Sequence, residues 1–96
     1  MVQLKIDLDP EQVTETRLVL HNAGLKSTTA RILVLNAILS ASEPITHADI
    51  ALNSNLIGFD KSTIYRNLSD LCKANLISRF QDPGDAWKYL ISSTEK

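Results

Sequence analysis

Apolar side chains recur with helical spacing through most of the chain, most clearly in the segment that starts at Asp60. One stripe of this segment is apolar and consists of Ile64, Leu68, Leu71 and Cys72. The opposite face is polar, with Tyr65 at its margin, and consists of Ser62, Arg66, Ser69 and Lys73. The pattern predicts an amphipathic helix, capped by the Asp60 carboxylate and ended near Asn75 in a left-handed conformation.

Two longer helices are predicted before it. Asp9, Pro10 and Gln12 form a start signal with a capping box, and the helix should run to Ala23 and stop at a left-handed Gly24. Thr28 is predicted to cap the second helix. The apolar set of that helix is Ile32, Leu33, Leu35, Ile38 and Leu39.

A short third helix should follow the break at residues 42–44. Thr46 and Asp49 have the spacing of a capping box. The apolar content of this helix is Ala48, Ile50, Ala51 and Leu52. Residues 53–59, which include Gly58, then form a turn before the amphipathic helix.

The periodicity changes after residue 75, where alternation predicts two strands at 76–81 and 86–91. Residues 82–85 place Pro83 and Gly84 at the centre of a turn, which suits type II. These segments therefore predict a β-hairpin.

The order of these elements predicts a mainly α fold with a small β-hairpin, a winged helix-turn-helix. The single domain would comprise an extension (1–9), the helices (10–75), the wing hairpin (76–91) and a polar tail (92–96). The recognition helix would be residues 61–74. The predicted core includes Leu20, Leu33, Leu35, Ile38, Ile50, Ile64, Leu68, Leu71 and Ile77.

Composition narrows the function. The 96 residues suit one small domain, and no apolar run reaches the ~20 residues of a membrane span. No signal peptide is evident, so we expect a cytoplasmic protein. The net charge is −1, but residues 16–80 carry seven basic and four acidic side chains, which permits contact with phosphates.

The chain shows no pattern typical of an enzyme or a metal site. His21 and His47 belong to different predicted helices, and the only cysteine, Cys72, is expected to be a small buried apolar residue. No nucleophile triad, Gly-rich phosphate loop or paired carboxylate motif is present. We therefore expect no catalysis, no cofactor and no metal.

Three segments resemble the ferric uptake regulator (Fur) family. Residues 23–35 (AGLKSTTARILVL) are similar to the segment that opens its DNA-binding domain, residues 62–71 (STIYRNLSDL) to its recognition helix, and residues 74–79 (ANLISR) to the approach to its wing. The similarity covers roughly residues 17–91. It implies a winged-helix DNA-binding domain of a metal- or peroxide-responsive transcription regulator.

The resemblance implies that Tyr65 and Arg66 contact DNA bases or phosphates, and that Thr28 and Arg31 lie where they can meet a phosphate. Lys26 matches the lysine of the family's opening segment. With the polar side chains of the recognition helix, the predicted DNA-binding residues are Lys26, Thr28, Arg31, Lys61, Ser62, Thr63, Tyr65, Arg66, Ser69 and Lys73.

The chain also departs from the family. His21 and Asn22 stand where many relatives have a basic residue used towards the minor groove. The sensing histidine of the family falls near Pro44, and its wing glutamate falls at Tyr89 or Leu90. The sequence ends where the family's dimerisation domain, with its CxxC zinc pairs, would begin.

Two functions remain open. The first is a sequence-specific DNA-binding transcription regulator, or the isolated DNA-binding domain of one, with double-stranded DNA as its partner. A homodimer or a partner regulator would then raise the affinity for DNA. The second is a winged-helix module that binds protein and has little or no affinity for DNA, which the acidic segment 1–15 and the acidic turn 82–85 favour.

Overall fold

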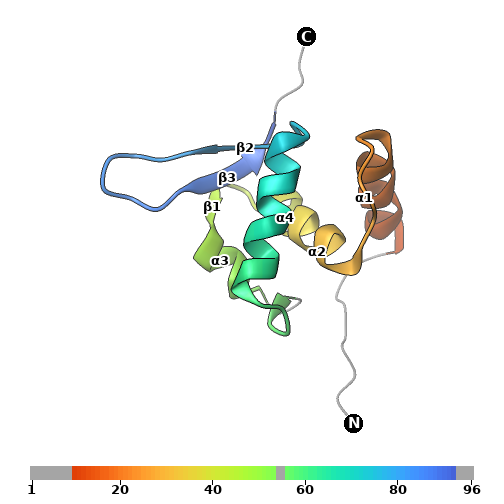
Figure 1. Ribbon diagram of the computed structural model, residues 1–96, viewed down its shortest axis with the longest axis horizontal. Coiled ribbons are helices and arrows are strands. Elements are labelled where there is room, and N and C mark those ends of the chain that lie inside the picture. The colour runs from red at the N-terminus through yellow and green to blue at the C-terminus, as the bar shows by residue number, and fades with distance from the viewer. Residues whose placement is uncertain (1–9, 54–55, 93–96) are drawn as a thin grey trace.

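The computed structural model describes residues 10–53 and 56–92, so the predicted cap at Asp9 lies outside the described residues. Within them the chain forms four helices and a small antiparallel sheet (Figure 1). The helices are α1 (Pro10–Asn22), α2 (Thr29–Ser40), α3 (His47–Ala51) and α4 (Lys61–Lys73). The strands are β1 (Ile45–Thr46), β2 (Ile77–Phe80) and β3 (Lys88–Ile91). The predicted mainly α fold with a hairpin is confirmed.

The helix ends follow the predicted capping chemistry with one exception. The Thr28 hydroxyl accepts from the Arg31 amide at 3.2 Å, and Thr46 and Asp49 form the reciprocal capping box. Asn75 adopts a left-handed φ of 63° just after α4. The predicted cap of α4 was wrong, because Asp60 occupies the N-cap position but its carboxylate accepts no capping hydrogen bond. The Asp60 side chain is exposed to water, and its carboxylate lies near the positive end of the helix dipole without a hydrogen bond to a backbone amide.

The sheet contains one strand more than predicted. The strand order is β1-β3-β2, and both pairings are antiparallel. β1 has only two residues, so no alternation marks it in the sequence. At the predicted turn the Asp85 amide donates to the Asp82 carbonyl at 3.0 Å, and Gly84 has the positive φ, 81°, that type II requires. The hairpin β2–β3 is the wing, which projects away from the helices (Figure 1).

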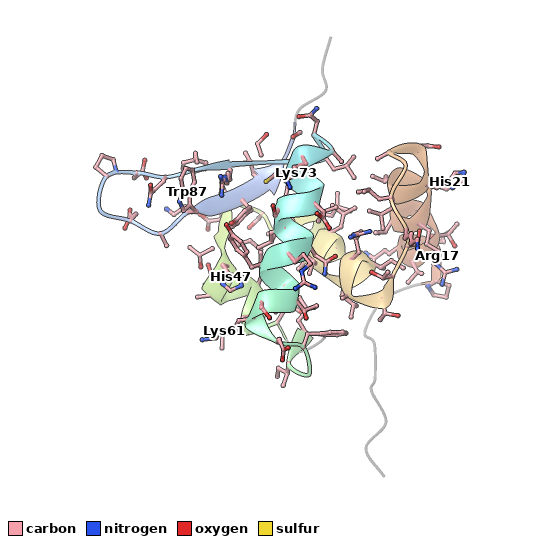
Figure 2. All side chains as sticks on the ribbon, in the orientation of Figure 1. Arg17, His21, His47, Lys61, Lys73 and Trp87 are labelled. Carbon is pink, nitrogen blue, oxygen red and sulfur yellow. The ribbon has the colours of Figure 1, made fainter. Side chains whose placement is uncertain are left out.

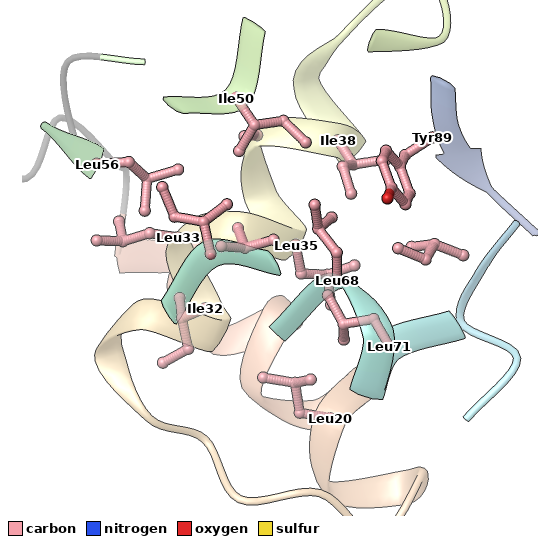
Figure 3. Packing of buried hydrophobic residues seen from close by; sticks show 14 residues of the cluster. Leu20, Ile32, Leu33, Leu35, Ile38, Ile50, Leu56, Leu68, Leu71 and Tyr89 are labelled. Carbon is pink, nitrogen blue, oxygen red and sulfur yellow. The ribbon is translucent and has the colours of Figure 1, made fainter. Parts of the chain in front are cut away.

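The core lies around α2, which contacts α1, α3, α4 and β3 (Figure 3). All nine predicted core residues belong to one buried cluster, and five more residues join it: Ile32, Val34, Ala37, Leu56 and Tyr89. Seven consecutive α2 residues, Ile32–Ile38, are buried, so this helix has no solvent-facing stripe over that stretch. α4 packs across it, and this contact fixes which face of α4 remains in solvent.

Three expectations about apolar residues need correction. Leu39 is 46% exposed in the last turn of α2, and Leu52 is 78% exposed just after the end of α3. Cys72 is half-buried and packs against the edge of the core. It behaves as a small apolar residue, as expected, but not as a fully buried one.

Candidate nucleic-acid interface

The outer face of α4 is polar and open to solvent. Ser62, Arg66 and Lys73 are exposed, and Tyr65 is 52% exposed. Arg66 makes no hydrogen bond or ion pair with any other described residue. Its guanidinium is therefore available to bind an acceptor from outside, with a planar fork of donors that suits phosphate or guanine.

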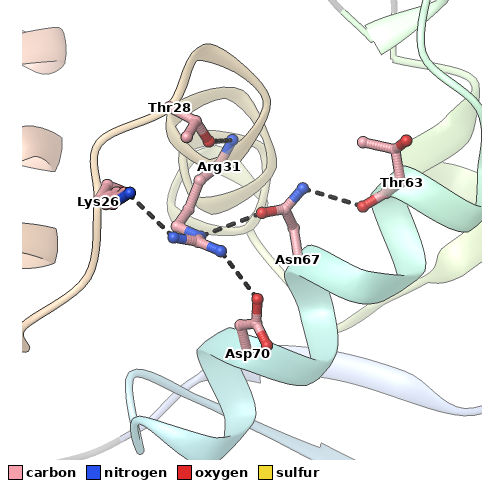
Figure 4. Close-up of polar contacts among 6 residues, drawn as sticks. All are labelled: Lys26, Thr28, Arg31, Thr63, Asn67 and Asp70. Atoms are coloured by element: carbon pink, nitrogen blue, oxygen red, sulfur yellow. Dashed lines mark hydrogen bonds and ion pairs between the residues drawn. The ribbon is translucent and has the colours of Figure 1, made fainter.

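The orientation of this face depends on Arg31, which joins α2 to α4 (Figure 4). The guanidinium of Arg31 donates to the Asp70 carboxylate at 2.8 Å, to the Asn67 side-chain oxygen at 3.1 Å and to the Lys26 carbonyl at 3.1 Å. The Arg31 side chain is only 15% exposed. In the structure two of its donors bind side chains of α4 and hold this helix on the body of the domain, and a third binds the Lys26 carbonyl before α2. The contact of Arg31 with a DNA phosphate stays a prediction.

Asn67 extends this bracing network into α4. It is buried, accepts from Arg31, and donates through its amide nitrogen to the Thr63 carbonyl at 2.9 Å. Both ends of the amide are thus satisfied, and no buried side-chain polar atom in the described parts of the chain lacks a partner. One side of α4 is therefore held by polar contacts, which leaves Arg66 directed to solvent.

The other predicted residues belong to α4 or lie just before α2, and they differ in exposure. Lys26, Thr28 and Lys61 are exposed, whereas Thr63 and Ser69 are partly buried. His47, at the start of α3, donates from Nε2 to the Lys61 carbonyl at 3.2 Å and packs edge-on against Tyr65, with ring centroids 6.2 Å apart. These contacts join the two helices of the helix-turn-helix and support the Tyr65 ring.

Three residues of the wing, Arg79, Trp87 and Tyr89, were not among the predicted site residues. Arg79 of β2 pairs with Tyr89 of β3, and its guanidinium lies 4.5 Å from the centre of the Trp87 ring. Hydrogen bonding to the Tyr89 hydroxyl, and to that of Tyr65, raises the pKa of Arg79 above its ordinary value. The sequence shows that the wing has aromatic residues, but it does not show that Arg79 contacts them.

Burial also affects two ionisable groups near Arg79, the phenol of Tyr89 and the thiol of Cys72. It raises the pKa of the Tyr89 phenol and of the Cys72 thiol, and the nearby guanidinium opposes both shifts. Both groups therefore remain protonated at neutral pH, and the area between α4 and the wing has a positive charge.

The elements define a winged helix-turn-helix, with α3 and α4 as the helical pair and β2–β3 as the wing. None of the helices in the described residues has the length and apolar content to cross a membrane.

Solved structures of Fur proteins share this fold. The chain matches the Vibrio cholerae ferric uptake regulator at 23% identity with a TM-score of 0.71, covering 83% of this chain and 63% of that one. It matches Helicobacter pylori Fur at 23% identity with a TM-score of 0.68, covering 100% and 64%. It matches the Pseudomonas aeruginosa ferric uptake regulator at 26% identity with a TM-score of 0.72, covering 82% and 61%.

The resemblance to the Fur family is thereby confirmed for the fold. The chain has the fold of a Fur winged-helix domain and spans less than two thirds of each of these three Fur chains. No family model matches the chain, and no curated protein is significantly similar to it.

The residues present do not fit a Fur-type metal site. The Helicobacter pylori structure is described as having three functional metal-binding sites, and the Pseudomonas aeruginosa one was solved with manganese. In the described residues of this chain no three His, Cys, Asp or Glu side chains lie together. His21 and His47 lie on opposite sides of the domain (Figure 2). The resemblance places the family's sensing histidine near Pro44 and its wing glutamate at Tyr89 or Leu90, and none of these three residues is a ligand of that kind.

Proposed function

We propose that this domain binds double-stranded DNA as a transcription regulator, or as the DNA-binding part of one, with α4 in the major groove. The observation that carries the proposal is that Arg66 faces solvent beside Tyr65 and has no partner among the described residues. It lies on the helix that winged-helix proteins use for reading bases. The likeness to three ferric uptake regulators supports it. Nothing in this arrangement requires catalysis, and we infer that the protein is not an enzyme.

The predicted residues would make different kinds of contribution to DNA binding. Arg66 and Tyr65 would contact base edges, while Ser62, Lys61 and Lys73 would contact phosphates. Thr28 caps α2, whose first-turn amides offer a further phosphate contact together with Lys26. Arg31 would contribute indirectly by holding α4 in place, with Thr63 and Ser69 at the edge of the interface.

Affinity is expected to be modest for a single copy. The net charge is −1, and the wing tip carries Asp82 and Asp85. A monomer would therefore bind a half-site weakly. A second copy or a partner regulator would raise the affinity for DNA, because binding of one module holds the other at a high effective concentration near its site. We place this activity in the cytoplasm, where DNA would be accessible to the regulator.

The experiment is a selection of bound duplexes from a random pool, followed by a salt titration on the enriched sequence. The proposal expects an enriched motif and an affinity that falls as salt rises, since phosphate contacts release counterions. The domain should be tested alone and fused to an artificial dimerisation segment. Failure of both forms to bind any duplex would contradict the proposal.

A protein-binding function is the second candidate, and a separate surface favours it. Exposed apolar side chains lie at α1, the end of α2 and the end of β3: Leu18, Val19, Leu39 and Ile91. An apolar groove of about 240 Å³ runs among them, lined in part by Val19, Leu39 and Ile91. This surface does not include the α4 face, so protein binding there is compatible with DNA binding.

A further inference from the structure

A polar pocket of about 150 Å³ lies between α4 and the sheet. Four of its residues come from α4: Tyr65, Ser69, Cys72 and Lys73. Tyr65 lies four positions before Ser69, and Cys72 and Lys73 lie three and four positions after it, so all four border the same side of the helix. The wing strands supply Arg79 and Tyr89. No carboxylate lines this pocket, so its charged groups are both positive.

Arg79 is held in place by neutral groups. Tyr89 stands opposite it in the sheet, and the flat guanidinium stacks on Trp87 at 4.5 Å. Neither contact neutralises the charge. Across the described ranges the only ion pair joins Arg31 to Asp70, so Arg79 and Lys73 both face the pocket without a carboxylate partner. A cation fixed before binding loses little freedom when it meets an anion.

The surrounding donors define the ligand. Tyr65 and Ser69 contribute hydroxyl groups that can donate to oxygen, and a guanidinium with an ammonium group complements a tetrahedral oxyanion. Tyr65 belongs both to this pocket and to the exposed face of α4. A duplex bound on that face would therefore bring its backbone close to the pocket.

We propose that this pocket binds a phosphate group, with Arg79 and Lys73 as its two charged ligands, and that the group is a backbone phosphate of DNA. The choice of DNA as the source rests on the proposed function, whereas the phosphate chemistry does not. The root of the wing would then contact the DNA backbone, and the acidic wing tip at Asp82 and Asp85 would stay clear of it.

Two measurements test the site. The first is the salt dependence of duplex binding by Arg79→Gln and Lys73→Gln, with Arg17→Gln as the matched control. Arg17 lies on α1, on the other side of the domain from Trp87 (Figure 2), and its replacement removes the same charge. Each pocket variant should reduce the slope of log affinity against log salt by ~1, and the control should leave the slope unchanged.

The second measurement uses Trp87, the single tryptophan of the chain, as the reporter. Inorganic phosphate is titrated against potassium chloride at equal ionic strength while tryptophan emission is recorded. Because the ring stacks on Arg79, occupation of the pocket should change the emission saturably. The change should vanish in Lys73→Gln, a variant in which the stack of Arg79 on Trp87 remains intact. Melting temperatures confirm that each variant is folded.

The outcomes separate this proposal from the proposed function. Wild-type duplex binding with both slopes unaltered and no phosphate response would overturn the phosphate pocket and leave DNA binding intact. A saturable phosphate response without duplex binding would support the pocket, identify free phosphate as its ligand and reject DNA as the source. Absence of both duplex binding and a phosphate response would overturn the two proposals together.

Discussion

The guanidinium of Arg31 lies 2.8 Å from the carboxylate of Asp70, and this ion pair joins the start of α2 to the C-terminal part of α4. The pair is charge-assisted and partly shielded, with the Asp70 side chain 34% exposed. Because Asn67 accepts from the same guanidinium, two positions on one side of α4 are held at once. The helix cannot rotate about its axis without breaking these bonds, so the direction of Arg66 is coupled to Arg31.

The first prediction concerns this brace. Arg31→Ala should lower the free energy of unfolding by ~1–3 kcal/mol, since it removes the ion pair and leaves the buried Asn67 oxygen without its donor. A double-mutant cycle with Asp70→Ala should give a coupling of ~1 kcal/mol, because the pair is partly exposed. Urea unfolding of the four proteins measures both values. A coupling of zero would show that the pair does not hold the helices together.

The second prediction concerns the contact between α4 and the core. Leu68 is fully buried, and Leu68→Ala should cost ~2–5 kcal/mol through lost burial and the cavity that remains. Leu18→Ala is the matched control, because Leu18 is 55% exposed and its loss should cost within ~0.5 kcal/mol. Equal effects of the two substitutions would contradict the described packing of α4.

The third prediction follows from the raised pKa values of Cys72 and Tyr89. Their ordinary values are 9.0 and 10.0, and burial disfavours the ionised form of each in the folded chain. The unfolded chain therefore loses these protons first as pH rises, so the stability is present below about pH 9 and is lost above it. Urea unfolding from pH 8 to 11 should show this decline.

Two variants assign that decline to its sources. Cys72→Ala should flatten its lower part, and Tyr89→Phe should flatten its upper part. If stability fell equally in both variants and the wild type, the ionisations would have to lie elsewhere.

The fourth prediction is that folding requires no metal. No three potential ligand side chains gather in the described residues, and proline and tyrosine stand at positions 44 and 89. A chelator should leave the melting temperature unchanged, and metal analysis of the purified protein should find no stoichiometric zinc. A tightly held ion that stabilises the fold by several kcal/mol would contradict this prediction.

The sequence predicted the parts of the fold that depend on local chemistry. The capping box at Thr46 and Asp49, the left-handed Asn75 and the type II turn at Gly84 each involve residues a few positions apart. The core set was also predictable, because helical periodicity marks the buried face of α4, and α2 is apolar over most of its length. The predicted polar face of α4 agrees with the exposure of Ser62 and Arg66.

The sequence could not predict the contacts that depend on register and on distant residues. A hairpin with only the two turn residues Pro83 and Gly84 would pair Arg79 with Lys88; the structure pairs it with Tyr89, a shift of one residue. Such a shift moves a side chain to the other face of a strand, and here it brings Arg79 opposite Tyr89. The bond between Arg31 and Asp70 spans 39 positions, and no periodic pattern marks it.

The most direct test of the central claim is duplex binding by wild-type protein and Arg66→Ala at two salt concentrations, with the melting temperature as control. Arg66 is exposed and has no partner among the described residues, so the variant should fold normally. The account predicts a loss of ~1–3 kcal/mol in binding if Arg66 reads a base edge, largest on the preferred sequence. Unchanged affinity of the folded variant would contradict the assignment of α4 as the DNA-reading helix.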